Sequence, residues 1–382
     1  MTARWVLGVD SGGSGLRTAL APAGTETSAA TSAAGAQGVP GAVGRTVSAE
    51  PVRTGAAGID ATHLLEQLLP AARSLLAEAG GGRVDTVCVG AAGMATLGAG
   101  LRATLPAALA EALGVCRLAL AADAVTAYAG ALGEEPGAVV AAGTGMIALG
   151  TDLRGWRRAD GWGHLLGDRG GGAWIGQAGL DAALRAFDGR AGGSAALRKR
   201  AELLFDCRVD GLPAVLYPRT DRPAVLASFA PEVLRCASGV DGGGVDPVAA
   251  GIVRRAAEEI AATAAAVCPP AEDARPDRTT TEPTADPTAN DATTDRAGAE
   301  DTGPDGAGAV SDAHPRVALT GGLFRSGTAL LEPVREQLAV RLPHARAVTA
   351  AGDPLDGALL VATRLSVNAL RLPTGSPLLT VS

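Results

Sequence analysis

The sequence predicts an α/β protein with two similarly built domains. Its 382 residues are enough for about two domains of roughly 100–200 residues each. Hydrophobic residues make up 47% and charged residues 19%, a balance that favours buried cores over a disordered polyelectrolyte. Short apolar strands alternate with stretches of helical periodicity, and a unit of strand, glycine turn and strand occurs twice. This alternation is typical of a sheet whose faces are covered by helices.

The first half begins with two strands joined by the glycine-rich turn Ser11-Gly12-Gly13-Ser14-Gly15. Leucines at helical spacing then predict two helices, and apolar runs predict a strand before and a strand after the second helix. The first of these strands ends at Ala91-Ala92-Gly93, and the other stops at Asp123. In chain order we expect the six elements at residues 4–10, 16–21, 62–79, 84–90, 101–113 and 117–122.

The second half repeats this unit, with two predicted strands on either side of Gly143-Thr144-Gly145. Two later helices carry the same start signal, an aspartate cap followed by proline, at Asp246-Pro247 and Asp353-Pro354. The prolines Pro269-Pro270 stop the first of them. A further apolar strand ends at Gly321-Gly322. In chain order we expect these elements at residues 138–142, 146–150, 246–268, 317–320 and 353–370.

Residues 269–315 differ in composition from the rest of the chain. They contain seven prolines and many Thr, Ala and Asp residues, and Val310 is the only branched aliphatic residue. Such a segment cannot bury enough apolar surface to offset its ordering entropy, so we predict a disordered insertion. It holds eleven acidic residues and three arginines, a net charge of −8, so the remaining residues carry +1 of the total −7.

Composition argues against several classes of protein. Aromatic residues make up only 3%, which argues against a stacking surface for single-stranded nucleic acid, and the net charge of −7 argues against binding to a phosphate backbone. No apolar run of 18 residues is free of charge and no signal peptide is apparent, so we expect a cytoplasmic protein with no membrane partner. The five cysteines are scattered, which supports neither a disulfide framework nor a zinc site.

Three glycine-rich turns each follow an apolar strand, where ligands bind in sheets of this kind. Glycine amides can approach phosphate oxygens closely because no side chain blocks the way. Asp10 precedes the first turn and is placed to hold Mg²⁺, although it could instead initiate the turn by bonding its own backbone. Asp123 could accept the proton of an attacking hydroxyl in phosphoryl transfer, or cap the helix that follows. Together the turns and aspartates have the order of a two-domain nucleotide clamp.

The densest polar cluster runs from Asp160 to Gly172 and contains Trp162, His164 and Asp168. An indole offers a sugar an apolar face to stack on, and the Asp168 carboxylate could accept hydrogen bonds from hydroxyl groups. His164 fits a structural role better than a catalytic one. The cluster therefore favours a carbohydrate site.

The block Gly161-Trp162-Gly163-His164-Leu165-Leu166-Gly167-Asp168, followed by Gly172-Ala173-Trp174-Ile175-Gly176, resembles the N-acetylglucosamine kinase branch of the BadF/BadG/BcrA/BcrD ATPase family. This family belongs to the superfamily of actin, sugar kinases and heat-shock ATPases. The three glycine turns and the Ala122-Asp123-Ala124 segment are similar to its phosphate, adenosine and catalytic motifs. The resemblance covers the chain except residues 269–315.

The resemblance implies two ribonuclease H-like, actin-like ATPase domains with a nucleotide cleft between them. The N-terminal domain would span residues 1–123 and the C-terminal domain residues 124–352, with the insertion at 269–315. The helix of residues 353–371 would return to the N-terminal domain. Related kinases often form homodimers, so the resemblance also admits a homodimer.

The resemblance further implies a kinase that moves the γ-phosphoryl group of ATP to the 6-hydroxyl of N-acetylglucosamine or a related amino sugar. Asp123 would be the general base, and Asp10 would serve Mg²⁺. The nucleotide would contact Gly12, Gly13, Ser14, Gly143, Thr144, Gly145, Gly321 and Gly322. The sugar would contact Gln37, Gly93, Asp123, Gly161, Trp162, Gly163, His164 and Asp168.

This chain departs from the family pattern at three positions: Gln37 stands where an asparagine is usual, Met146 where a small polar residue is usual, and Arg169 where a glutamate is usual. The extra methylene of Gln37 would displace its amide and alter which sugar substituent is recognised. Glucosamine is an alternative substrate. Two alternatives to the kinase function are a non-catalytic sugar- and nucleotide-binding regulator and an activator of a radical dehydratase. The activator would need cysteines for an iron–sulfur cluster, and the scattered cysteines give no convincing set.

Overall fold

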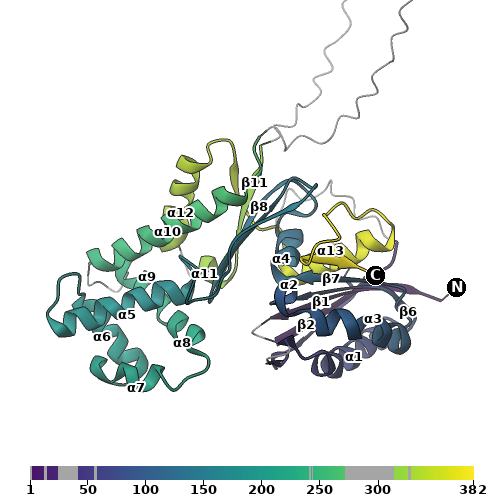
Figure 1. The fold of residues 1–382 in the computed structure, drawn as a ribbon, viewed down its shortest axis with the longest axis horizontal. Coiled ribbons are helices and arrows are strands. Elements are labelled where there is room, and N and C mark those ends of the chain that lie inside the picture. The colour runs from purple at the N-terminus through teal and green to yellow at the C-terminus, as the bar shows by residue number, and fades with distance from the viewer. Residues whose placement is uncertain are drawn as a thin grey trace, which may run out of the picture.

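The computed structural model describes residues 2–12, 15–24, 42–55, 58–240, 242, 244–271, 314–325 and 328–382. These residues form two lobes, each built around one large mixed sheet (Figure 1). In the first lobe the strand order is β13 (Leu379–Val381), β7 (Arg117–Ala122), β6 (Arg83–Ala91), β1 (Arg4–Gly12), β2 (Gly15–Pro22) and β3 (Gly44–Ser48). In the second lobe it is β10 (Trp156–Asp160), β9 (Met146–Thr151), β8 (Gly137–Ala142), β11 (Arg316–Thr320) and β12 (Arg346–Thr349).

Three parallel strands form the centre of the first-lobe sheet. β1 pairs in parallel with β6, and β6 with β7, whereas β2 and β13 are antiparallel to their neighbours β1 and β7. Residues 5–11 of β1 are all buried, the continuous pattern expected of a strand covered on both faces. Helices α1 (Ala61–Glu78) and α3 (Ala99–Leu113) cover one face, and α4 (Asp123–Leu132) and α13 (Pro354–Ser366) cover the other (Figure 1). The short elements α2 (Met94–Leu97), β4 (Thr54–Gly55) and β5 (Gly58–Ile59) complete this lobe.

The second-lobe sheet is covered by α10 (Pro247–Val267), which packs on β8, β9 and β10 and carries α12 (Thr328–Arg341) against it. Helix α4 contacts β8, β9 and β11. The side chain of Asp246 caps α10 by accepting a hydrogen bond from the Ala249 amide, as its sequence predicts. The remaining elements are α5 (Gly172–Asp188), α6 (Ala195–Phe205), η1 (Val209–Gly211), α7 (Leu212–Leu216), α8 (Arg222–Ser228), α9 (Ala230–Ser238) and α11 (Gly322–Arg325).

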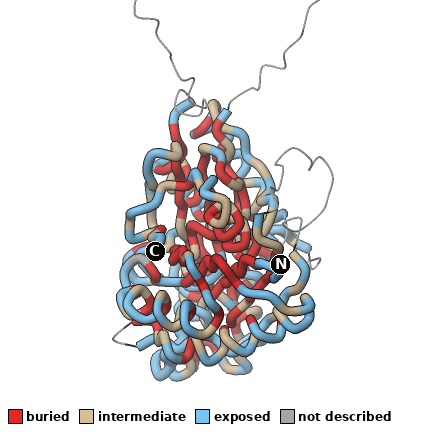
Figure 2. The backbone as a smooth tube through the Cα atoms, turned by 90° about the vertical axis from the view of Figure 1, so that its right-hand side faces the viewer, coloured by how far each residue is buried: buried red, intermediate tan, exposed pale blue. Residues whose placement is uncertain are grey.

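Helices α4 and α13 connect the two lobes. They cross so closely that a Cβ on Gly357 would lie 1.8 Å from the carbonyl oxygen of Thr126, and one on Gly130 would lie 2.0 Å from that of Asp353. Buried residues run through the centre of the molecule (Figure 2), and the first-lobe core includes Val139 and Ala318 of the second-lobe sheet. The lobes are therefore joined by apolar packing as well as by the chain.

The predicted fold class, an α/β protein with a repeated strand–turn–strand unit, is confirmed. The strands β3, β10, β12 and β13, the helices α5 to α9 and α12, and the short elements β4, β5, α2, α11 and η1 were not expected, and α13 ends at Ser366 rather than near Leu370. β10 reads Trp-Arg-Arg-Ala-Asp and is an edge strand paired only with β9, so its sequence lacks the apolar signal of a central strand. The predicted insertion lies outside the described residues, except for residues 269–271 and 314–315. We found no described helix with the length and apolar character needed to cross a membrane.

Candidate active site

In the first lobe, the parallel strands bring predicted site residues to one edge of the sheet. Ser11 pairs with Ala91, and Ala91 pairs with Ala122, so the carboxyl ends of β1, β6 and β7 are level. Gly12, Gly93 and Asp123 follow at these three ends. Because ligands of parallel sheets bind outside the carboxyl ends of the strands, this edge is the expected position of a site.

The second sheet presents a matching edge. Thr320 of β11 pairs with Ala141, and Asp160 of β10 pairs with Ile147, so the glycine turn after β8, Gly321 after β11 and the loop after β10 leave the sheet together. Gly321 has a φ of +106°, and a Cβ there would lie 2.2 Å from the carbonyl oxygen of Ala142. Only glycine fits at this position, which lies beside the turn of residues 143–145.

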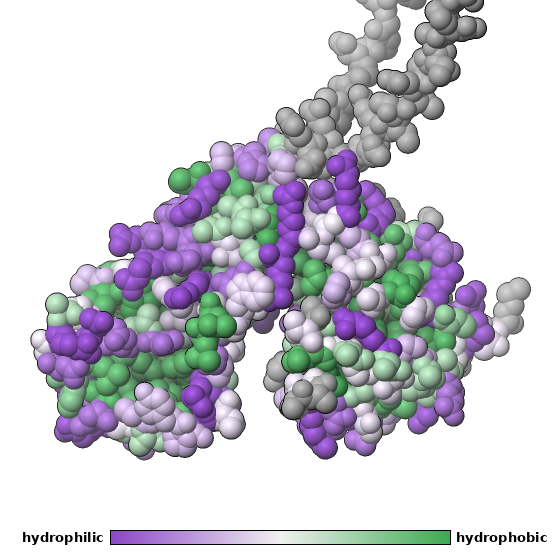
Figure 3. All heavy atoms as spheres, viewed as in Figure 1, coloured by the Kyte–Doolittle hydropathy of each residue, from purple (hydrophilic) through white to green (hydrophobic). Residues whose placement is uncertain are grey.

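A hollow opens between the two lobes (Figure 3). Asp123 is partly buried, and its loss of hydration raises its pKa. The amide of Ala124 opposes this shift, the charge of Asp10 adds to it, and the charge of Arg158 opposes it. Since Asp10 belongs to β1 and Arg158 to β10, the Asp123 carboxylate is within electrostatic reach of both sheets.

Asp123 is the first residue of α4, and its Oδ1 accepts a hydrogen bond of 2.9 Å from the Ala124 amide. The N-cap position itself is held by Ala122, whose side chain makes no capping bond. Asp123 is therefore not the N-cap of α4. It is an acidic residue in the first turn, where its negative charge interacts favourably with the positive end of the helix dipole. Its position leaves the carboxylate at the sheet edge, where a hydroxyl group could reach it.

Asp10 is 8% exposed and is bound by an arginine from the next strand. Its Oδ2 accepts hydrogen bonds from Arg17 Nε at 3.0 Å and Arg17 Nη2 at 2.6 Å, and Arg17 Nη1 lies 2.6 Å from Asp353 Oδ2. Burial raises the pKa of Asp10 although Arg17 opposes the shift. Because Arg17 faces Asp10 in the β1–β2 register, the pairing follows from the hairpin itself.

The surroundings of Asp10 fit a magnesium ion held partly by the substrate. No cluster of three or more His, Cys, Asp or Glu side chains gathers as a metal cage within the described ranges. Mg²⁺ commonly binds through one or two carboxylates and fills its octahedron with water and substrate phosphates. Asp10 at the mouth of a phosphate turn provides that donor set.

Backbone hydrogen bonds connect the turn of residues 143–145 to the start of α5. Gly143 donates to the carbonyl of Gly145 at 2.9 Å, and its own carbonyl accepts from the Gly172 amide at 2.9 Å. The carbonyl of Thr144 accepts from the Ala173 amide at 2.8 Å. Gly143 and Thr144 remain exposed, so the turn is fixed by the first residues of α5 and keeps an open face.

The loop after β10 is closed by two aspartates in the left-handed region, Asp160 at φ 58° and Asp168 at φ 56°. Asp160 accepts the amides of Asp168 at 2.6 Å and Arg169 at 2.9 Å, and Asp168 Oδ1 accepts the amide of Gly163 at 3.0 Å. Partial burial raises the pKa of Asp168, with the Gly163 bond opposing the shift. A Cβ on Gly145 would lie 2.3 Å from Asp168 Oδ2, so this loop touches the phosphate turn.

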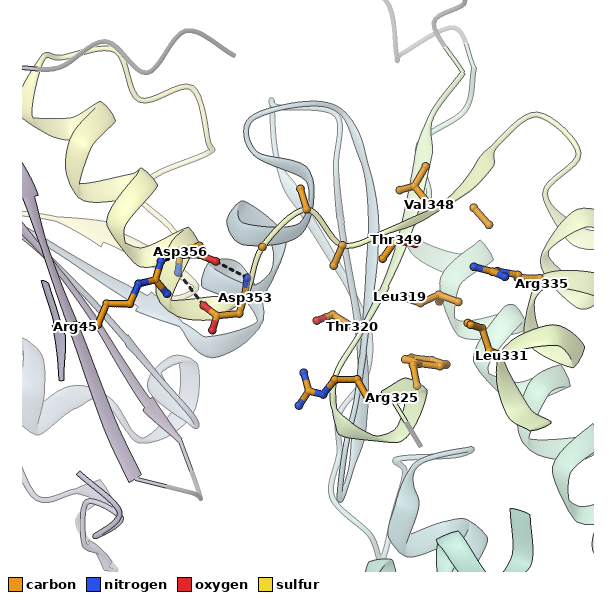
Figure 4. A pocket seen from close by; sticks show the side chains of 16 residues that line it. Arg45, Leu319, Thr320, Arg325, Leu331, Arg335, Val348, Thr349, Asp353 and Asp356 are labelled. Atoms are coloured by element: carbon orange, nitrogen blue, oxygen red, sulfur yellow. Dashed lines mark hydrogen bonds and ion pairs between the residues drawn. The ribbon is translucent and has the colours of Figure 1, made fainter. Parts of the chain in front are cut away.

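A cavity of about 480 Å³ opens beside Gly321, between the second-lobe sheet edge and the start of α13 (Figure 4). Its second-lobe wall combines apolar side chains with Arg325 and Arg335, and its first-lobe wall holds the ion pair of Arg45 with Asp356. The apolar lining comprises Leu319, Phe324, Leu331, Ala347, Val348, Ala350 and Ala351. A flat heterocycle could be buried there, next to the glycine that the sequence places at the adenosine motif.

Comparison with known protein families identifies the family of this chain. Residues 7–277 match the model of the BadF/BadG/BcrA/BcrD ATPase family. The chain belongs to this family. Membership implies that the chain uses ATP, in agreement with the predicted phosphate turns.

Individual relatives of this BadF/BadG/BcrA/BcrD ATPase include sugar kinases. Over 69 residues it is 44% identical to the N-acetylmuramic acid/N-acetylglucosamine kinase of Clostridium acetobutylicum, a match that spans 18% of this chain and 22% of that protein. A structure from Chromobacterium violaceum assigned as an N-acetylglucosamine kinase has a TM-score of 0.54 and 25% identity, and covers 94% of this chain and 98% of that chain. One from Porphyromonas gingivalis with the same assignment has a TM-score of 0.55 and 15% identity, covers 93% and 97%, and shows the fold alone. These likenesses confirm the expected actin-like ATPase fold.

The predicted site residues of this family member fall into two groups. Those of the first lobe lie at the carboxyl ends of its parallel strands: Asp10, Gly12, Gly93 and Asp123. Those of the second lobe lie at the matching strand ends of its sheet: Gly143, Thr144, Gly145, Gly161, Trp162, Gly163, His164, Asp168, Gly321 and Gly322. Gly13, Ser14 and Gln37 lie outside the described residues, so their predicted contacts remain predictions.

Sequence reasoning missed Arg17 and Arg158, named Asp160 only as the first residue of the polar cluster, and named Asp353 only as a helix cap. Arg17 and Arg158 are single arginines among many, and only tertiary structure shows which carboxylates they face. Asp160 carried a usable signal, because an aspartate that begins a glycine-rich loop is a natural residue for a positive φ.

Proposed function

We propose that this protein is an ATP-dependent sugar kinase that transfers the γ-phosphoryl group to the 6-hydroxyl of N-acetylglucosamine or a closely related amino sugar. One observation carries the proposal: the Asp123 carboxylate stands at the end of β7, within electrostatic reach of Asp10 on one sheet edge and Arg158 on the other. A base at this point can meet a hydroxyl held by one edge and a phosphate held by both.

The nucleotide would lie along the glycine turns. The exposed turn of residues 143–145 would offer the amides of Thr144 and Gly145 to a phosphate, because the Gly143 amide is already bound to the Gly145 carbonyl, and Gly12 would lie at the turn on the other lobe. The base would enter the cavity beside Gly321. Mg²⁺, when bound with ATP on the Asp10 side, would neutralise charge on the phosphate oxygens.

The sugar would lie on the Trp162 loop. The Trp162 indole is 64% exposed and presents an apolar face to one side of a pyranose ring, and the Asp168 carboxylate can accept hydrogen bonds from its hydroxyl groups. Asp123 would accept the proton of the attacking hydroxyl, since its raised pKa makes it a stronger base than a hydrated aspartate. Closure of the lobes would exclude water, the competing phosphoryl acceptor.

Coupled release of ADP across a sugar panel tests the proposal. The panel contains N-acetylglucosamine, N-acetylmuramic acid, glucosamine and glucose, with ATP and Mg²⁺. We expect sugar-dependent turnover that falls by at least about a thousandfold in Asp123→Asn. The control is Asp221→Asn, which changes an exposed aspartate at the N-terminus of α8 and should leave turnover unchanged. Absence of turnover with every sugar, or full turnover in Asp123→Asn, would refute the kinase assignment. Sugar binding in calorimetry without ADP release would instead indicate a regulator on the same fold.

A further inference from the structure

Arg158 contacts the exposed indole of the candidate sugar site. Its guanidinium carbon lies 4.5 Å from the centroid of the Trp162 ring, within the range of a cation–π interaction. Its Nε donates to the carbonyl of Asp160 at 3.1 Å, and its Nη2 donates to the carbonyl of Gly161 at 2.5 Å. One side chain therefore spans the turn that carries Trp162 and covers one face of its ring.

The turn that carries Trp162 is rich in glycine, and the backbone of Gly167 lies against the base of the indole. The neighbours of Trp162, Gly161 and Gly163, both have positive φ, at 71° and 84°, and the Trp162 side chain is 64% exposed. An indole on such a turn would otherwise sample several rotamers, and a ligand that stacks on it would have to select one of them. The stacked guanidinium restricts the ring, while most of the Trp162 surface stays accessible to a ligand.

The backbone of the same loop is held by other groups. The Asp160 carboxylate binds the amides of Asp168 and Arg169, and the Asp168 carboxylate binds the amide of Gly163. Arg158 is thus placed to govern the orientation of the Trp162 ring, while Asp160 governs the path of the chain.

We propose that Arg158 is a positioning residue that holds the Trp162 indole as a preformed platform for the pyranose ring of the substrate. This inference rests on the proposed sugar-kinase function and adds a residue that determines sugar affinity. The guanidinium acts through its planar shape, which allows it to stack on the ring and to reach two carbonyls at once. A lysine at this position keeps the charge but has neither property.

The test compares Arg158→Gln and Arg158→Lys with Arg157→Gln. Arg157 is the neighbouring arginine of β10 and points to the opposite face of the sheet, so its substitution removes the same charge without touching the platform. Calorimetry measures the affinity for the sugar that the panel identifies and for a non-hydrolysable ATP analogue. In Arg158→Gln we expect sugar affinity about five- to tenfold weaker and the affinity for the analogue unchanged. Arg158→Lys should restore less than half of the sugar affinity lost in Arg158→Gln. Arg157→Gln should bind the sugar with wild-type affinity.

A second readout does not depend on sugar. The chain has four tryptophans, so 5-fluorotryptophan labelling gives four ¹⁹F resonances, and loss of one signal in Trp162→Phe assigns the Trp162 signal. We expect Arg158→Gln to move that resonance alone, and the effects of Arg158→Gln and Trp162→Ala on sugar affinity to be non-additive, because both remove the same platform.

Wild-type sugar affinity in Arg158→Gln, full recovery in Arg158→Lys, or additive effects of the two substitutions would overturn the role of Arg158 and leave the kinase assignment intact. If the wild-type protein binds no sugar of the panel, the proposed function fails first and this role fails with it.

Discussion

Arg17 donates two hydrogen bonds to a single oxygen of Asp10, at 3.0 and 2.6 Å, and places the rest of its guanidinium on Asp353. The buried carboxylate beside the phosphate turn is thereby linked to the residue that caps α13. Helix α13 joins the second lobe back to the first. The guanidinium of Arg17 therefore binds both the candidate magnesium ligand and the start of the helix that connects the lobes.

We predict that Arg17→Gln lowers the free energy of unfolding by about 2–3 kcal/mol, because it leaves the Asp10 carboxylate buried without its counter-ion. Urea denaturation followed by far-UV circular dichroism measures the change. Arg219→Gln removes one partner of the fully exposed pair with Asp221 and should leave the free energy of unfolding nearly unchanged. Equal losses in the two variants would show that the Arg17 pair contributes no more than a surface pair.

Asp123→Asn should raise the melting temperature while it removes turnover. The folded protein raises the pKa of Asp123, so between the unfolded and folded pKa values the folded state binds more protons and its stability falls as pH rises. The amide removes this penalty yet still accepts the Ala124 hydrogen bond. We expect an increase of about 2–4 °C at pH 7 that shrinks toward pH 4 in differential scanning fluorimetry. An increase independent of pH would contradict this origin.

The close crossing of α4 and α13 predicts that Gly357→Ala destabilises the protein by about 3 kcal/mol or more, since the new Cβ would lie 1.8 Å from the Thr126 carbonyl oxygen. Gly251→Ala is the matched control. It lies within α10 with no atom within 4 Å of the new Cβ, and should stabilise the protein by about 0.5–1 kcal/mol. Thermal and urea denaturation measure both, and opposite signs are the expected result.

Asp160→Ala should weaken sugar binding and spare the nucleotide. The substitution removes the acceptor of two amides and places alanine at a φ of 58°. We expect the KM for sugar to rise on the order of tenfold, with the KM for ATP within about twofold of the wild type. Asp160→Asn keeps one acceptor oxygen and tolerates the same φ, so it should lie between alanine and wild type. A larger change in the KM for ATP than for sugar would assign the loop to the nucleotide instead.

The parts of the fold that could be predicted are those with a local signal. Strands β1, β6, β7 and β8 are apolar runs that end in or are closely followed by Asp or Gly, and α10 and α13 each begin at a proline that follows an aspartate N-cap. The aspartates and glycines of the candidate site stand at those strand ends, so the same signal located them.

The parts that could not be predicted depend on partners distant in sequence. β13 is three residues long and exists because Leu379 and Val381 find Ala121 and Ala119 of β7. Arg17 differs from other arginines only in facing both Asp10 and Asp353, which is 336 residues away. Propensity and periodicity contain no information about such pairings.

The pairing of β13 with β7 also sets an order for biosynthesis. Strand β7, which ends at Ala122, pairs on one side with β13 of residues 379–381, and helix α13 covers the same sheet with residues 354–366. The ribosome therefore synthesises the whole second lobe before α13 and β13 are available to complete the first lobe. Until then the edge of β7 offers unpaired backbone groups to any other extended chain.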